Sequence, residues 1–97
     1  MKLKIDGTDY EVPILTAADY EDFDELFRKT AQEDLHWLDR NKAVVSIICA
    51  KMRATFPDLT DRSIKASISM PKLRDLFSWV CHGKNGEAQQ PTVESPK

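Results

Sequence analysis

Residues 35–57 read LHWLDRNKAVVSIICAKMRATFP, the most apolar stretch of the chain. Apolar side chains cover more than half of the circumference when this stretch is drawn as a helix, which is typical of a helix packed on several sides. Pro57 cannot continue the helical hydrogen-bond ladder, so the helix should end at Phe56. We therefore predict a central core helix from Leu35 or Asp39 to Phe56, with the apolar residues Leu38, Val44, Val45, Ile47, Ile48, Cys49, Met52 and Phe56.

The segment before the central helix is acidic and amphipathic. Thr16 followed by Asp19 resembles a capping box, so a helix should begin near Ala17. Five carboxylates between residues 19 and 25 fall early in this helix, where the macrodipole favours negative charge. Its apolar stripe is formed by Tyr20, Phe23, Phe27 and Ala31, with Leu26 beside it.

The segment after the central helix predicts two further helices. Asp58 or Thr60 caps a short one that runs through Ile64 and Ile68. Ser69-Met70-Pro71 then gives a second start signal, with Pro in the first turn. Leu73, Leu76, Phe77 and Val80 share one face of the final helix, and Gly83 is placed to be its left-handed C-cap.

The N-terminus predicts a β-hairpin. Residues 2–5 alternate polar and apolar, Asp6-Gly7 supplies a tight turn, and residues 10–12 resume the alternation. Leu3 and Ile5 should share one face with Tyr10 and Val12. A two-stranded hairpin is only marginally stable alone, so this one should rest on the helices.

These elements define the expected fold class. With 97 residues, the chain has room for one domain. We predict a mainly α fold over residues 1–83, in which a short N-terminal β-hairpin is followed by a small bundle of about four helices. Residues 84–97 are polar and contain two Pro, so we expect a disordered tail there.

Charge is distributed unevenly along the chain. Residues 1–41 hold 5 Lys and Arg against 11 Asp and Glu, a net charge of −6, whereas residues 42–97 hold 9 against 5, a net charge of +4. The plain interpretation is two solvated faces, and the alternative is self-association through oppositely charged ends. The overall charge of −2 argues against a nucleic-acid partner.

Catalytic and metal-binding motifs are missing from the sequence. His36 and His82 are far apart, and Cys49 and Cys81 lie in apolar helical patterns without CxxC spacing. We therefore expect no enzyme activity, catalytic residue, cofactor or metal. No apolar run approaches 18 residues, so we expect no membrane association, and the free cysteines fit a reducing cytoplasm.

One alternative is a small DNA-binding regulator. Residues 59–80 form a short helix, a break and a second helix, as in a helix-turn-helix, and carry Lys65, Lys72 and Arg74. The usual turn glycine is absent, and the acidic first half of the chain would repel DNA. This alternative requires the three cations to share one exposed face.

The order of features resembles that of a known family. A short alternating N-terminus, LKIDGTDYEVP at residues 3–13, precedes an acidic amphipathic helix opened by Thr16. A long apolar helix follows, and FPDLTD at residues 56–61 makes a break before the last helices. In this layout, residues 1–83 resemble the tail assembly chaperones of long-tailed (siphophage-type) bacteriophages.

The resemblance implies a non-enzymatic role. Such chaperones bind the tape measure protein in the cytoplasm of the infected bacterium and assist tail tube assembly, where the major tail protein is a further partner. They are absent from the mature virion, so a structural head-tail connector component is the alternative that remains in the particle. An amphipathic tape measure helix would bind in an apolar groove, for which we expect the partner-binding residues Phe23, Phe27, Trp37, Met52, Phe77 and Trp79.

Overall fold

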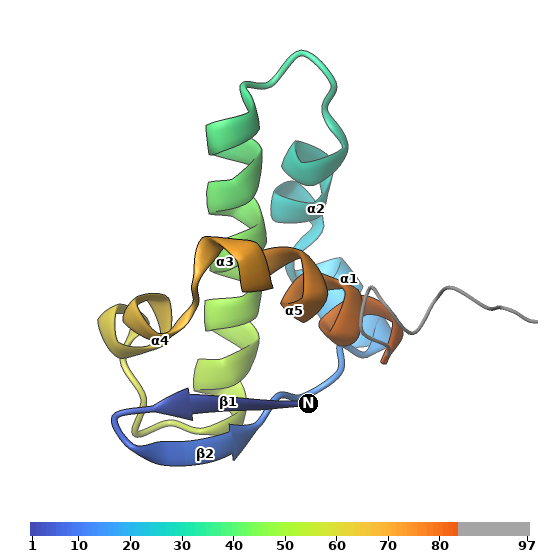
Figure 1. Cartoon of the computed structure of the whole chain (residues 1–97). Coiled ribbons are helices and arrows are strands. Elements are labelled where there is room, and N and C mark those ends of the chain that lie inside the picture. The colour runs from blue at the N-terminus through green and yellow to red at the C-terminus, as the bar shows by residue number, and fades with distance from the viewer. Residues whose placement is uncertain (84–97) are drawn as a thin grey trace, which may run out of the picture.

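A computed structural model describes residues 1–83, and the tail expected at residues 84–97 lies outside the described residues. The chain forms a hairpin and then five helices (Figure 1). The predicted mainly helical fold with an N-terminal hairpin is confirmed. In chain order the elements are β1 (Lys2–Ile5), β2 (Thr8–Glu11), α1 (Ala17–Asp22), α2 (Asp24–Ala31), α3 (Trp37–Thr55), α4 (Asp61–Ser67) and α5 (Met70–His82).

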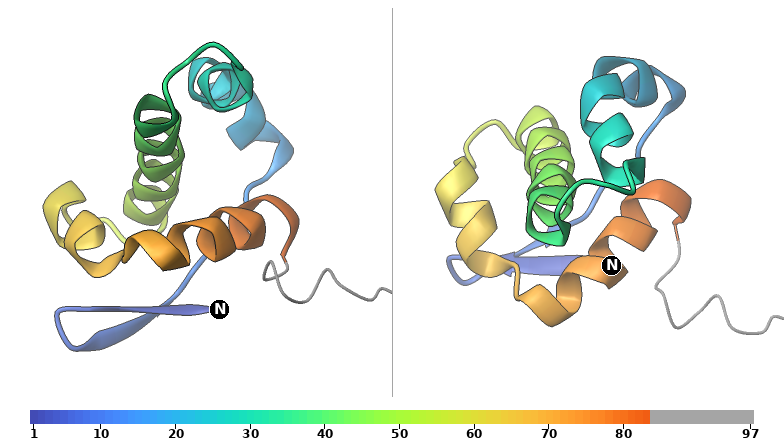
Figure 2. Two further views of the ribbon diagram at one scale, coloured as in Figure 1. Left: turned by 45° about the horizontal axis from the view of Figure 1, so that its top comes forward. Right: turned by 90° about the horizontal axis from the view of Figure 1, so that it is seen from above.

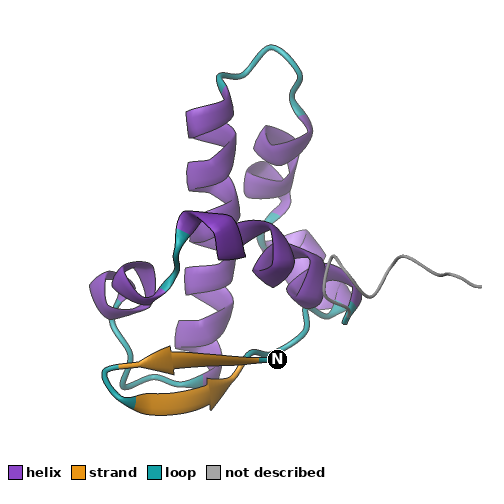
Figure 3. Cartoon of the chain, in the orientation of Figure 1, coloured by secondary structure: helices purple, strands orange, loops and turns teal. Residues whose placement is uncertain are grey.

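The hairpin has the register that the alternation predicts. Leu3 pairs with Tyr10 in an antiparallel ladder, and Leu3 and Ile5 are buried. Asp6 and Gly7 have φ values of 52° and 83°, as a turn that matches the twist of the two strands requires. The hairpin lies at one end of the molecule, beneath the helices (Figure 3), and rests on α4 and the core.

The acidic segment forms two short helices where the sequence predicts one. Phe23 leaves helical geometry, with φ −105° and ψ 23°, and separates α1 from α2. The break gives α2 its own N-terminus, so Asp24 and Glu25 fall in a first turn, where the macrodipole stabilises negative charge. An unbroken helix would hold the same carboxylates in its interior.

The start of α1 is fixed by its cap and by an ion pair. The Thr16 amide donates to the Asp19 carboxylate at 2.8 Å, and the Asp19 amide donates to Thr16 Oγ1 at 3.3 Å. The Lys51 ammonium lies 2.8 Å from the same carboxylate, and both side chains are largely buried. This pair ties α1 to α3 and lowers the pKa of Asp19.

The core surrounds the C-terminal two-thirds of α3. Ile47, Ile48 and Met52 are fully buried there, against Ile64 of α4, Leu76 of α5 and the apolar face of the hairpin. Fully burying one such side chain stabilises a fold by about 1.5–3 kcal/mol. The α3 helix is therefore the central element that its apolar coverage predicts.

The last helix runs across α3 (Figure 2). Thr60 caps α4 in a reciprocal capping box with Ser63, and Gly83 ends α5 with a left-handed φ of 72°. The Trp79 indole donates to the Val12 carbonyl at 2.7 Å and joins α5 to the end of the hairpin. Among residues 1–83, no helix combines the length and apolar character needed to cross a membrane.

Candidate functional site

The N-terminal end of α3 extends beyond the core. The first buried residue of this helix is Ala43, six positions after its start. One side of this end is covered by α2 (Figure 1). On the surface, Leu38 of α3 and Met70 of α5 remain 42% and 57% exposed. Large apolar side chains are therefore left in contact with water on two neighbouring helices.

Two adjoining concavities lie between α3 and the α4–α5 segment, and we call them together the α3–α5 groove. They share Asn41 and Met70. The larger, of about 490 Å³, is also lined by Leu38, Lys42, Val45, Ser46, Lys65 and Ile68. The smaller, of about 310 Å³, is completed by Val44, Leu73, Arg74 and Phe77.

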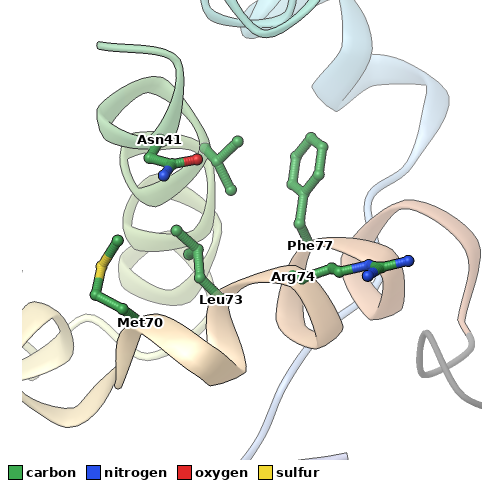
Figure 4. Close-up of a pocket in the computed structure, with 6 residues that line it drawn as sticks. Asn41, Met70, Leu73, Arg74 and Phe77 are labelled. Atoms are coloured by element: carbon green, nitrogen blue, oxygen red, sulfur yellow. The ribbon is translucent and has the colours of Figure 1, made fainter. Parts of the chain in front are cut away.

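The walls of the smaller concavity come from α3 and α5. Figure 4 shows Met70, Leu73 and Phe77 projecting from α5 toward the side on which Asn41 lies. The Arg74 side chain instead extends along α5, away from Asn41 (Figure 4). The interior of this concavity is consequently mostly apolar, and the guanidinium group of Arg74 lies at the rim.

Every charged side chain that lines the groove is basic. Lys42, Lys65 and Arg74 are exposed, and no Asp or Glu is among the lining residues. Within residues 1–83, none of these three cations forms an ion pair. The groove therefore combines apolar walls with cations that are available to a partner.

Three of the expected partner-binding residues lie at or near the groove. Phe77 lines it, and Phe27 packs against Phe77 with ring centroids 6.2 Å apart. Trp37 is 57% exposed at the start of α3, next to the groove residue Leu38. Phe77 is thus a wall residue, Phe27 of α2 packs against it, and Trp37 is an exposed sequence neighbour of a lining residue.

Met52, also expected to bind the partner, has no exposed surface, belongs to the core and does not line the groove. Two other expected residues also have structural contacts. Trp79 is half-buried and directs its indole N–H to the Val12 carbonyl. Phe23 is half-buried at the α1–α2 break and packs against the core cluster. Neither lines the groove.

Sequence reasoning missed most of the groove-lining residues. Leu38, Asn41, Lys42 and Val45 have the spacing i, i+3, i+4, i+7, so they share one face of α3. That face is half apolar and half polar, so it does not form the purely apolar stripe by which a binding face is usually recognised in a sequence. The available signal was the apolar coverage of α3, which is wider than one packing face requires.

The two cysteine thiols and the His36 ring lie outside the groove. Burial raises the pKa of the Cys49 and Cys81 thiols, so both remain protonated at neutral pH and are poor nucleophiles. The His36 ring caps α3, because its Nδ1 accepts from the Leu38 amide at 3.1 Å. Among residues 1–83, no group of three His, Cys, Asp or Glu side chains is placed to hold a metal ion.

The three cations of the DNA-binding alternative do not share one face. Lys65 and Arg74 border the α3–α5 groove. Lys72 lines a separate concavity with Lys2 and Lys4 of the hairpin. Because residues two apart on a helix point in nearly opposite directions, Lys72 and Arg74 lie on different sides of α5, which disfavours a single recognition surface.

Comparisons with known protein families, curated protein sequences and solved structures find no match to this chain. The feature of residues 1–83 on which we base a proposal is the α3–α5 groove. Its exposed apolar side chains, together with the unpaired cations on its rim, are suited to binding a partner through side-chain contacts.

Proposed function

We propose that this protein is a non-enzymatic assembly chaperone that holds an apolar helical segment of a partner in the α3–α5 groove. The observation that carries the proposal is the exposure of Leu38 and Met70 on opposite walls of one groove. Exposed apolar side chains that are grouped in one groove, and not scattered singly, support an interaction site. An amphipathic helix laid into such a groove buries its own apolar stripe together with these side chains.

The tape measure protein of a long-tailed bacteriophage is the partner that the family resemblance favours. The chaperone would act in the cytoplasm of the infected bacterium, keep this long apolar chain soluble, and assist the major tail protein in assembling the tube. It would leave before the virion is complete. The apolar side chains that line the groove support a role of this kind.

The size of the groove favours binding by many copies. Its two concavities, of about 490 and 310 Å³, are within the range of ordinary small-molecule pockets. Each accommodates a few side chains, and one helical turn advances only about 5.4 Å. One copy therefore covers a short part of a long helical partner, and a complete coat requires several copies along it.

Self-association is a second part of the proposal. The acidic α1–α2 segment and the basic residues of α4 and α5 give the molecule two regions of opposite charge. Attraction between such regions is screened by salt. We expect light scattering to show a mass that rises with concentration at low salt and returns to the monomer at high salt.

The test of the proposed function is capture of the partner by the full chain. Tagged protein recovered from infected or induced cells should carry a long helical chain with several copies of the chaperone. Leu38→Asp and Met70→Asp should abolish this capture, because each places a charge in the apolar groove. Ile14→Asp is the matched control, since Ile14 is also exposed, at 47%, but does not line the groove.

Other outcomes would contradict the proposal. Equal capture by the two groove variants would mean that the partner binds elsewhere. Finding the protein in finished particles would favour the head-tail connector alternative. Sequence-specific DNA retardation that depends on Lys65 and Arg74 would favour the regulator.

A further inference from the structure

We propose that the α3–α5 groove selects an acidic amphipathic helix, one whose apolar stripe is flanked by carboxylates. This inference rests on the proposed function and specifies the chemistry of the partner segment. The apolar walls explain why a helix binds. The charges around those walls decide which helix binds.

The cations stand on different walls of the groove. Lys42 belongs to α3 and Lys65 to α4, and both line the larger concavity. Arg74 of α5 lies at the rim of the smaller one. A helix seated between these walls would place the residues flanking its apolar stripe near the cations. Carboxylates at those flanks would gain ion pairs, whereas lysines would be repelled.

The start of α5 adds positive potential at the same place. Met70 is the first residue of this 13-residue helix and lines both concavities. The N-terminus of a helix carries a partial positive charge. No acidic residue occurs in the first turn of α5, and the Ser69 side chain does not cap it. The helix dipole and the three cations therefore favour the same sign of partner charge.

A second copy of this chain is a poorer occupant of the groove. The acidic segment of the chain is α1–α2, and its apolar side chains Phe23, Leu26 and Phe27 already pack against the chain's own core. A second copy could offer carboxylates from this segment, but the apolar stripe beside them is not free. A separate partner helix can present both.

The expected selectivity is moderate. Exposed ion pairs typically change affinity by about two- to fivefold each. Three such pairs, together with the helix terminus, should give an acidic helix roughly tenfold or greater advantage over a basic one at low salt. This advantage should shrink at about 0.5 M salt, where the Debye length is only a few ångströms.

The experiment uses three synthetic amphipathic peptides with the same apolar stripe and with Glu, Gln or Lys on the flanks. Fluorescence anisotropy measures their binding to the full chain at low and high salt. We expect the Glu peptide to bind tightest and the Lys peptide weakest. Equal binding of all three would overturn the charge selectivity and leave the proposed function standing, whereas no binding of any peptide would contradict both.

A charge-swap variant identifies the groups responsible. The triple substitution Lys42→Glu, Lys65→Glu and Arg74→Glu should reverse the order, so that the Lys peptide binds tightest. Lys72→Glu is the matched control on the other side of α5 and should leave the order unchanged. Circular dichroism checks that both variants fold, and the single substitution Lys65→Glu replaces the triple one if that variant does not.

Sedimentation of the chain alone tests the competing occupant. We expect that Met70→Ala, which truncates a groove wall and changes no charge, leaves its oligomeric state unchanged. If this substitution dissociated a dimer, and if no peptide displaced the second copy, then a second copy would fill the groove. This result would overturn the inference.

Discussion

The same substitution at two methionines should have different effects on stability, because one methionine lies in the core and the other lines the groove. Met52 has no exposed surface, whereas Met70 is 57% exposed on the wall of the groove. Met52→Ala removes three buried heavy atoms and leaves a cavity, so it should lower the free energy of unfolding by about 2–5 kcal/mol. Met70→Ala removes atoms that already contact water, so its effect should stay within about 0.5 kcal/mol.

Urea denaturation followed by circular dichroism measures this difference. With a denaturant slope of about 1.5 kcal/mol per molar, a loss of 3 kcal/mol moves the midpoint by roughly 2 M. Met52→Ala should show such a shift, and Met70→Ala almost none. Binding should show the reverse order, because truncating a central interface side chain commonly weakens binding by more than about 1 kcal/mol. Equal destabilisation by the two substitutions would refute the assignment of Met70 to an open groove.

Three further substitutions test individual contacts. The Lys51 ammonium holds the pKa of Asp19 below its ordinary value of 3.8, so the ion pair stabilises the fold above that pH and this contribution is lost as the pH falls through the lowered pKa. Asp19→Asn should therefore lower stability at pH 7 and flatten its decline in acid, as measured by thermal unfolding from pH 2 to 7. Gly83→Ala should lower the free energy of unfolding by about 1 kcal/mol in urea denaturation, because φ at this position is 72°. Trp79→Phe leaves the part-buried Val12 carbonyl without its 2.7 Å indole donor and should cost about 1–3 kcal/mol, with faster amide exchange in the hairpin; unchanged exchange would contradict the link between α5 and the hairpin.

Most of the fold follows from local signals that are read over a few residues. Asp6-Gly7 identifies the hairpin turn, Thr60 and Gly83 mark helix ends, and Pro57 ends the central helix. Each depends on backbone geometry or hydrogen bonding within four residues. The break at Phe23 is different, because no proline or glycine marks it. The Asp19–Lys51 ion pair near this break joins residues 32 positions apart, which a local pattern does not show.

The groove was harder to predict than the fold. Residue type alone did not separate Met52 from Met70, since both are apolar and both lie in helices. Met52 is covered by the core cluster, whereas Met70 at the start of α5 is not, and this difference is a property of the packed helices. The prediction based on large aromatic residues included Phe77, which lines the groove. It also included Trp79, whose indole N–H donates to the Val12 carbonyl within the same chain.

The central claim is that the α3–α5 groove binds an apolar helix, and the methyl groups of the three methionines test it most directly. Met1 lines the concavity beside the hairpin, Met52 lies in the core, and Met70 lines the groove. In protein labelled with ¹³C at the methionine methyl carbon, titration with an amphipathic helical peptide should shift the Met70 signal and leave the other two nearly unchanged. A shift of Met1 alone, or no shift of Met70 at saturating peptide, would contradict the claim.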